Sequence, residues 1–110
     1  MITIKIFQVR RDIDEEEQIK VVFRDYDFVN ERNPDILRRD FHKYYTEVYE
    51  YDEEDAQNTN ILLNELYRKF QHDSEDCPDD FNGHSLSVSD VVFVDDTMYY
   101  CDNIGFEQIE

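Results

Sequence analysis

The sequence is poor in the residues that make sharp turns, cross-links and basic surfaces. Its 110 residues include two glycines, two prolines, two cysteines and no tryptophan. Residues 71–110 hold 11 of the 28 acidic residues and no lysine or arginine. No apolar run approaches the roughly 20 residues that span a bilayer. These absences argue against a disulfide framework, a membrane span and a basic nucleic-acid-binding stripe. The alternating start ITIKI is unlike a leader peptide, so we expect a cytoplasmic protein.

What the sequence has in abundance is negative charge. Aspartate and glutamate number 28 against 11 lysines and arginines, which gives a formal net charge of -17. Apolar residues still make up 40% of the chain and aromatic residues 15%, which is too rich for a disordered acidic tail. We therefore expect one folded domain over residues 1–110. Its field should repel nucleic acid and anionic membranes and attract cationic surfaces.

Alternating apolar residues predict several strands. Ile2, Ile4 and Ile6 share one face of a strand over residues 2–9. Segments rich in aromatic and β-branched residues predict the remaining strands. Residues 19–24 are expected to form a hairpin with the first strand. Residues 91–94 are expected to pair with 98–101 across an Asp95-Asp96-Thr97 connection. Two further strands are predicted over 43–51 and 105–109.

One main helix is predicted over residues 58–71, capped by Asn58 or Thr59. Its apolar residues recur at the spacing of one buried face, namely Leu62, Leu63, Leu66, Tyr67 and Phe70. Pro34 indicates a short helix over 34–40, and residues 52–55 read as a turn. The expected fold class is α+β: a small antiparallel sheet of about four to six strands with one main helix packed on it.

The acidic runs do not fit a metal site. Asp12, Asp14 and Glu16 have the first spacings of a calcium loop, but the glycine and glutamate that complete it are replaced by Glu17 and Phe23. A loop counted from Asp73 fails at the same two positions. The histidines and cysteines show no zinc-binding spacing. We expect no metal and no cofactor.

The sequence also lacks a recognisable catalytic motif. Ser85, Ser87 and Ser89 alternate with apolar residues and lack the glycines of a nucleophile elbow. Cys77 lies in an acidic loop, which blunts a thiol's reactivity, although the sequence leaves open a pairing with His84. We expect a protein that is not an enzyme. Turnover lost on replacing Cys77 or Ser87 would overturn that expectation.

The C-terminal part of the chain carries a specific motif. Residues 80–92 read DFNGHSLSVSDVV, and they are followed by Tyr99-Tyr100-Cys101-Asp102 and Gly105-Phe106. Over about the last forty residues this pattern resembles the YodL-like domain of phages and mobile elements of Gram-positive bacteria. The hairpin after residue 94 is shorter than that pattern and lacks a turn glycine. The resemblance implies a mobile-element protein that acts inside a bacterium, and it favours a fold-defining role for the serine-rich motif.

The acidic surface is the candidate functional feature. Fixed carboxylates can occupy the lysine- and arginine-lined channel that a nucleic-acid-binding enzyme offers to phosphates. In its size, its charge and the mobile-element context that the resemblance implies, the chain is similar to anti-CRISPR and anti-restriction proteins. We expect the partner-binding residues to be Asp12, Asp14, Glu15, Glu16, Glu17, Asp52, Glu53, Glu54, Asp55, Asp73, Glu75, Asp76, Asp79, Asp80, Asp95 and Asp96, with Tyr49 and Tyr51 as possible anchors.

The expected partner is the basic surface of a nucleic-acid-binding protein, with a type II CRISPR nuclease as the candidate. No direct contact with nucleic acid or membrane is expected, and the oligomeric state is left open. Two alternatives remain: a non-catalytic interaction module of a phage or conjugative-element complex, and charge that serves solubility alone. A module built on an apolar patch would bind almost independently of salt, whereas a DNA mimic would not.

Overall fold

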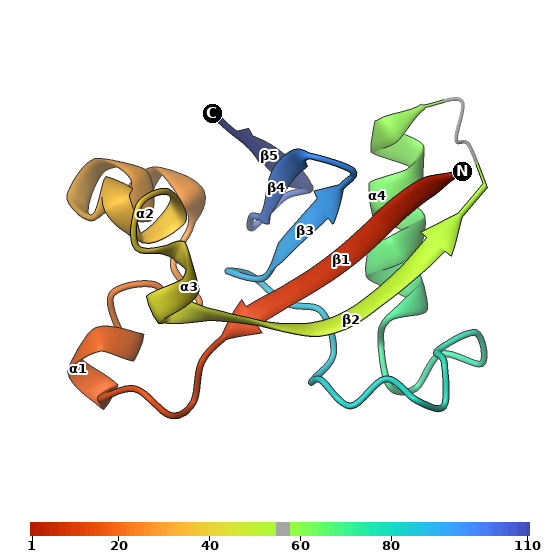
Figure 1. Cartoon of the computed structure of the whole chain (residues 1–110), viewed down its shortest axis with the longest axis horizontal. Helices are drawn as coiled ribbons and strands as arrows, with labels where there is room; N and C mark the ends of the chain where they lie inside the picture. The colour runs from red at the N-terminus through yellow and green to blue at the C-terminus, as the bar shows by residue number, and fades with distance from the viewer. Residues whose placement is uncertain (55–57) are drawn as a thin grey trace.

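The protein is built on a five-stranded antiparallel sheet. The computed structural model describes residues 1–54 and 58–110, and its strands lie in the order β2-β1-β3-β4-β5 (Figure 1). This confirms the α+β fold class. The strands are β1 (Ile2–Val9), β2 (Tyr45–Glu53), β3 (Val91–Val94), β4 (Thr97–Cys101) and β5 (Phe106–Ile109).

Strand β1, which lies between β2 and β3, sends its side chains to two separate cores. Ile4 and Ile6 are fully buried on one face, whereas Phe7 packs on the other. The register with β2 shifts between Ile6 and Phe7, which is the mark of a β-bulge. The bulge leaves Val48 between Glu47, opposite Phe7, and Tyr49, opposite Ile6. Beyond it, the side chain of Gln8 is buried on the same face as Ile6.

The first face of the sheet is covered by α4 (Thr59–Lys69) and the loop that follows it. The side chain of Asn58 caps the helix by accepting from the backbone N–H of Asn60 at 2.8 Å and of Ile61 at 3.3 Å. The predicted helix and its cap are confirmed. Tyr67 is an exception in the predicted buried stripe, because 42% of it is exposed. The buried residues that join α4 to the sheet include Leu62, Leu63, Leu66, Phe70, Phe81 and Leu86.

Part of the opposite face is covered by residues 10–44, which we call the helical segment. It contains α1 (Glu15–Gln18), α2 (Tyr26–Arg32), the 3-10 helix η1 (Pro34–Leu37) and α3 (Phe41–Tyr44). Figure 1 shows these short elements gathered at the end of the sheet away from α4. Val21, Val29 and Leu37 are fully buried there against Phe7 and its neighbours. In the described part of the chain, no helix is long and apolar enough to cross a bilayer.

Two local predictions are wrong. Residues 19–24 form turns, not a strand, because Val21 alone is buried there and both edges of β1 are already paired, one with β2 and the other with β3. Asp52 and Glu53 continue β2 instead of turning. The serine-rich stretch 84–90 ends in a turn, in which the Asp90 N–H donates to the Ser87 carbonyl at 3.1 Å.

Candidate functional site

Two of the predicted acidic runs meet at the start of β1. Thr3 binds both of them: its backbone N–H donates to Asp95 Oδ1 at 2.9 Å and its hydroxyl to Asp52 Oδ1 at 3.1 Å. Strand pairing places Glu50 opposite Lys5 on the same face, with 3.9 Å between Nζ and Oε1. We call Glu50, Asp52 and Asp95 the sheet-end cluster. It lies on the sheet face opposite α4, and all three residues are exposed.

The long acidic loop after α4 approaches the edge strand β2 from the other face. The Tyr49 hydroxyl donates to Asp80 Oδ1 at 2.8 Å. Further along, Glu53 and Asp76 line one small hollow of about 170 Å³, together with Glu65 and the cations Arg68 and Lys69. The runs near 52 and 73–80 are therefore brought close together, although cations of α4 share the space. Asp55 lies outside the described residues.

The predicted run from Asp12 to Glu17 lies elsewhere, in the helical segment, and several of its charges are paired there. Asp12 lies 3.6 Å from Arg10 Nη1. Glu17 binds Lys20 at 3.0 Å and accepts a short hydrogen bond from the Tyr44 hydroxyl. These contacts lower the pKa of Glu17, and the bond to Glu17 raises the pKa of Tyr44 to about 12. The structure thus separates this run from the sheet-end cluster.

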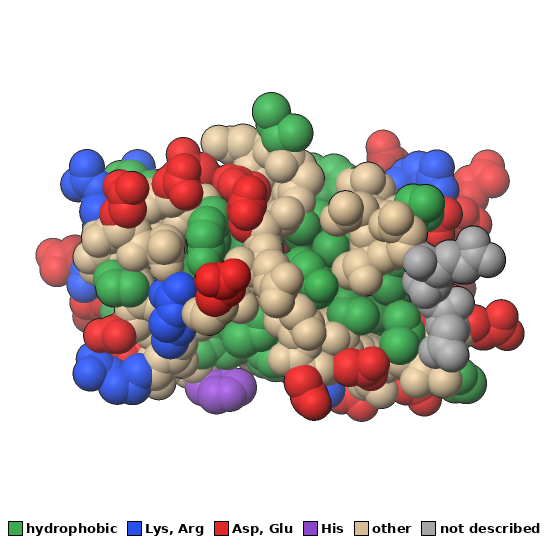
Figure 2. Space-filling model, turned by 90° about the horizontal axis from the view of Figure 1, so that it is seen from above, with side chains coloured by type: hydrophobic (Ala, Val, Ile, Leu, Met, Phe, Trp, Pro, Cys, Tyr) green, Lys and Arg blue, Asp and Glu red, His purple; other side chains and the backbone are tan. Residues whose placement is uncertain are grey.

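The two parts of the molecule differ sharply in net charge. The helical segment holds 10 acidic and 8 basic side chains, a formal charge of -2. Residues 1–9 and 45–110 hold 18 acidic and 3 basic side chains, which is -15 of the total of -17. Figure 2 shows lysine and arginine interspersed with acidic side chains at the end that carries the helical segment. The field that the sequence predicts therefore originates from residues 1–9 and 45–110, that is, from the sheet, α4 and the loops between them.

The tyrosines expected as anchors are used inside the fold. Tyr49 and Tyr51 lie on the α4 face, where both rings pack against Phe70 at centroid distances of 5.6 and 5.7 Å. Lys69 Nζ lies 4.9 Å from the centre of the Tyr51 ring. Desolvation by burial raises the pKa of Tyr51. These side chains hold the edge strand to α4 and point away from the sheet-end cluster.

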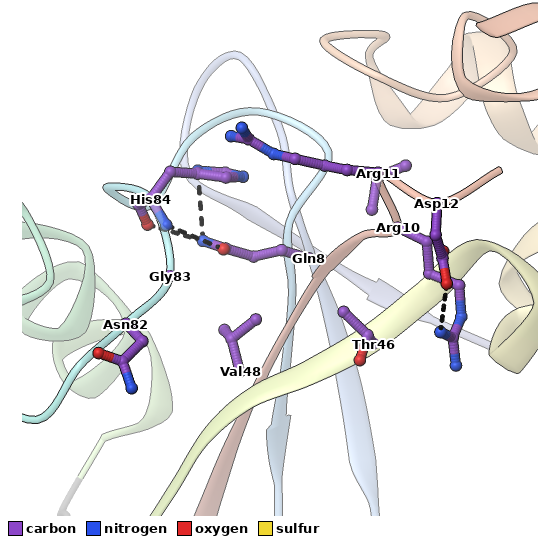
Figure 3. Close-up of a pocket in the computed structure, with 10 residues that line it drawn as sticks. Gln8, Arg10, Arg11, Asp12, Thr46, Val48, Asn82, Gly83 and His84 are labelled. Atoms are coloured by element: carbon purple, nitrogen blue, oxygen red, sulfur yellow. Dashed lines mark hydrogen bonds and ion pairs between the residues drawn. The ribbon is translucent and has the colours of Figure 1, made fainter. Parts of the chain in front are cut away.

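The serine-rich motif of residues 80–92 forms a buried polar joint between β1 and the loop before β3. Gln8 forms its centre: its Oε1 accepts from the His84 backbone N–H at 3.1 Å, and its Nε2 donates to the His84 carbonyl at 2.8 Å (Figure 3). The same Nε2 lies 3.1 Å from Asp90 Oδ2, which also accepts from the Ser87 N–H at 3.0 Å. His84 Nε2 lies 3.8 Å from Asp90 Oδ1.

Gly83 is required for this joint because the backbone passes very close to Gln8. A Cβ at this position would lie 2.6 Å from Gln8 Oε1, 3.0 Å from Val48 Cγ2 and 3.1 Å from the Phe81 ring. No side chain fits there unless the amide of Gln8 moves and gives up its bonds to His84. The glycine of the motif thus has a steric reason, independent of any ligand.

Ser89 is held in a left-handed conformation by bonds from three directions. Its φ is 86°, which is rare outside glycine and costs on the order of 1 kcal/mol. Its N–H donates to the Cys101 carbonyl at 2.9 Å, its carbonyl accepts from the Tyr45 hydroxyl at 2.5 Å, and its Oγ accepts from the Phe23 N–H at 3.2 Å. The turn therefore ties the helical segment, β2 and β4 together at one residue.

Burial dominates the acid–base properties of this joint. Asp90 is 1% exposed, and desolvation raises its pKa to about 8 in spite of the bonds from Ser87 and Gln8. Desolvation, followed by the charges of Asp90 and Asp102, raises the pKa of the Cys101 thiol to about 12. A thiol with such a pKa is a poor nucleophile at neutral pH.

The structure gives the other candidate residues ordinary roles. Cys77 and Cys101 are both free thiols, and Cys77 packs against the core beneath α4, whereas His84 binds Gln8. Within residues 1–54 and 58–110, no three His, Cys, Asp or Glu side chains gather as a metal site would require. Sequence reasoning missed Gln8, although a glutamine that continues the apolar Ile2, Ile4 and Ile6 face of a strand is itself a signal of a buried polar contact.

Comparison with known proteins adds one finding. No curated protein and no solved structure matches the chain. The model of one family, the YodL-like domain, matches residues 3–110. The match thus extends well beyond the last forty residues that carry the resemblance in the sequence, and it includes β1 and the helical segment. The chain belongs to the family of YodL-like domains.

Proposed function

We propose that this protein is a phage or mobile-element inhibitor that binds the cationic nucleic-acid-binding surface of another protein. The candidate target is a type II CRISPR nuclease, whose DNA channel holds the lysines and arginines that the carboxylates would engage. The observation that carries the proposal is the concentration of a formal charge of -15 on residues 1–9 and 45–110, outside the helical segment. The mobile-element context implied by the family resemblance supports the choice of target.

The sheet-end cluster is the part of this surface that best suits a cationic groove. Glu50 and Asp52 are alternate residues of β2, which places them about 7 Å apart, and Asp95 is held beside them in the β3–β4 turn by its bond to Thr3. They are therefore held at fixed spacing, which reduces the ordering cost of binding. Lys5 lies among them and is 3.9 Å from Glu50. Attraction of this kind accelerates association and weakens as salt is added.

A DNA-cleavage assay with a guided nuclease tests the proposal. The protein is added either before or after the nuclease has loaded its DNA target. Competition for the DNA channel predicts protection when the protein is added first and little protection when it is added second. Protection should also fall steeply between low and high salt. Equal protection in both orders would contradict channel competition, and no protection would remove this class of nuclease as the target.

Matched variants identify the surface. The triple variant Glu50→Gln, Asp52→Asn and Asp95→Asn removes three charges from the sheet-end cluster while keeping oxygen acceptors for Thr3. We expect its affinity for the target to fall about tenfold or more. The control is Asp14→Asn, Glu16→Gln and Glu31→Gln, three exposed carboxylates of the helical segment. A larger loss in the control than in the first triple would contradict the assignment of the surface.

A non-catalytic interaction module is the second candidate, and exposed apolar side chains favour it. Ile104 is 93% exposed at the β4–β5 connection, and Tyr67 is 42% exposed on α4. Tyr67 and Gly105 line the same hollow of about 210 Å³. A partner bound through this patch would be almost insensitive to salt. The variants Ile104→Ser and Tyr67→Ser would then weaken binding, and the sheet-end triple would not.

A further inference from the structure

A hollow of about 580 Å³ lies beside the polar joint, where β1 gives way to the helical segment. It is bounded on one side by residues 9–23 and on the other by residues 84–90. A second hollow of about 640 Å³ adjoins it and shares Val9, Arg11 and His84 with it (Figure 3). Volumes of this size suit a small-molecule ligand. The proposed inhibitory surface does not use this place.

Phe23 lies on the rim of the smaller hollow, with an exposed side chain and a left-handed backbone conformation. Its ring is part of a side chain that is 71% exposed, and its φ is 59°. A left-handed backbone is unfavourable for an aromatic residue and persists only where the surroundings enforce it. Here the Phe23 N–H donates to the Oγ of Ser89 at 3.2 Å. The turn therefore holds an exposed aromatic face at the mouth of a cavity, where a flat ring could stack on it.

Arg11 supplies a cation to both hollows. Within the described part of the chain its guanidinium makes no hydrogen bond or ion pair, and its carbonyl alone is used, as an acceptor for Gln18. Arg10 and Arg39 of the same segment are instead paired with Asp12 and Asp35. Figure 3 shows the Arg11 side chain extending back toward His84. A guanidinium without a partner is well suited to a phosphate, which it can bind through two parallel bonds.

The charges around the hollow do not prevent an anion from binding. Asp90 lines it, but burial raises the pKa of this carboxyl to about 8, so it is largely uncharged at neutral pH. Glu15 also lines it and is the one carboxylate there that opposes an anion. The sheet-end cluster lies at the start of β1 and the hollow at its end, a separation of about 20 Å along the strand, which is beyond the roughly 10 Å over which charges act in 0.1 M salt.

We infer that this hollow binds a nucleoside phosphate, with the base stacked on Phe23 and the phosphate held by Arg11. His84 and the serine hydroxyls of residues 85, 87 and 89 line the remaining wall and can bond the sugar or the base edge. The ligand would sit against the joint formed by Gln8, His84 and Asp90. Its binding would therefore hold the helical segment to the sheet.

Titration of the 15N-labelled protein with AMP, GMP, CMP and UMP tests the inference. At least one nucleotide should shift the amides of residues 9–23 and 84–90 in a saturable way. Inorganic phosphate alone should bind at least tenfold more weakly, because the stacking contribution of about 1–3 kcal/mol is missing. The inference is overturned if no nucleotide shifts these amides at millimolar concentration, if the shifts lie elsewhere, or if phosphate binds equally well.

Variants separate the two contacts. Arg11→Met should weaken binding about tenfold or more, whereas Arg39→Met, which removes a charge from the same segment, should not. Phe23→Asn removes the ring but tolerates the left-handed backbone, and it should also weaken binding, whereas Phe23→Tyr should not. Glu15→Gln should tighten binding. Undiminished affinity in either Arg11→Met or Phe23→Asn would overturn the corresponding contact.

The same variants keep this inference distinct from the proposed function. Arg11→Met and Phe23→Asn should leave protection in the nuclease assay unchanged. The sheet-end triple variant should leave nucleotide binding unchanged. Failure of one proposal therefore says nothing about the other, and the melting temperature of each variant confirms that the fold is intact.

Discussion

The helical segment and the rest of the chain differ in how their charges are balanced. Residues 10–44 carry nearly equal numbers of acidic and basic side chains, and ion pairs such as Arg10–Asp12 and Lys20–Glu17 join some of them. Residues 1–9 and 45–110 carry 18 acidic and 3 basic side chains, most of the acidic ones in the loops that join the strands and α4. The total charge of -17 is therefore distributed unevenly between the two parts. The comparison teaches that steering of a cationic partner belongs to the sheet, α4 and their loops, whereas the helical segment is free to hold an anion.

The largest expected effect comes from Asp90, where the two parts meet. Its pKa rises from 3.8 in the unfolded chain to about 8 in the fold. The folded state then binds the proton more tightly, so the contribution of Asp90 to stability is greatest below pH 4 and is lost as the pH rises to about 8. The contribution of Asp90 to this loss should be on the order of 5 kcal/mol.

The variant Asp90→Asn tests this effect, because it resembles the protonated acid at every pH. Urea unfolding between pH 4 and pH 8 should show a much smaller loss of stability in the variant than in the wild type. The sheet-end triple serves as the control, since it removes charge without touching the buried site. Parallel pH profiles for wild type and Asp90→Asn would show that burial does not govern this carboxyl.

The next effect concerns the close approach of β1 and the family motif. Gly83→Ala places a methyl group 2.6 Å from Gln8 Oε1, so it should displace the amide and cost about 3 kcal/mol of stability. Gly105→Ala is the matched control: φ is 69° there, but nothing lies within 4 Å of a new Cβ. The control should lose about 1 kcal/mol. Equal losses in chemical denaturation would mean that the joint adapts freely.

A smaller effect is expected at the start of α4. Asn58→Ala removes the acceptor for the N–H groups of Asn60 and Ile61 and should cost about 1 kcal/mol. Asn58→Asp keeps the cap and should preserve stability. Because α4 covers one face of the sheet, the substitution should lower the free energy of global unfolding. The ion pairs within the helical segment should remain unchanged. A null result in Asn58→Ala would indicate that packing alone fixes the helix start.

The smallest effect tests the charge comparison itself. Asp95 has a φ of 52°, which asparagine tolerates well, and it belongs to the charge-rich part. Asp95→Asn should stabilise the protein by a few tenths of a kcal/mol at low salt, and the gain should shrink at high salt. Asp12→Asn, which loses its pair with Arg10, should give no gain. Equal gains in stability from Asp95→Asn and Asp12→Asn would show that the helical segment and the rest of the chain experience the same average electrostatic field.

Periodic segments were the part of the fold that sequence reasoning predicted well. The alternating isoleucines of β1 and the apolar stripe of α4 report the faces that pack against each other. The β3–β4 hairpin follows from short apolar runs, whose Val91 and Val92 are buried on opposite faces. Residues 19–24 misled because Ile19, Val21 and Val22 are β-branched, although Val21 alone is fully buried. Whether such a segment pairs with β1 depends on a competing strand 70 residues further along the chain, and local pattern carries no information about it.

The sequence indicated that acidic runs form the candidate site, but it did not indicate which of these runs lie together in the fold. The acidic runs were visible in the sequence, but their grouping depends on strand order, which brings Asp52 and Asp95 to Thr3. The polar joint depends equally on a bond between Gln8 and His84, residues 76 apart. Likewise, the exposure of Phe23 follows from a backbone conformation that is imposed by a distant serine, Ser89.

The strand order has a consequence for the nascent chain. β1 leaves the ribosome before one of its two neighbours, β3, which begins at Val91. At a synthesis rate of about 5–20 residues per second, the edge of β1 that pairs with β3 remains unpaired for several seconds. During this time Ile4 and Ile6 belong to an incomplete sheet, and the unpaired backbone N–H and C=O groups of β1 can bind other molecules. The bulge and the charged residues Lys5 and Glu50 lie on the strands exposed in this interval, where they would discourage premature pairing between chains.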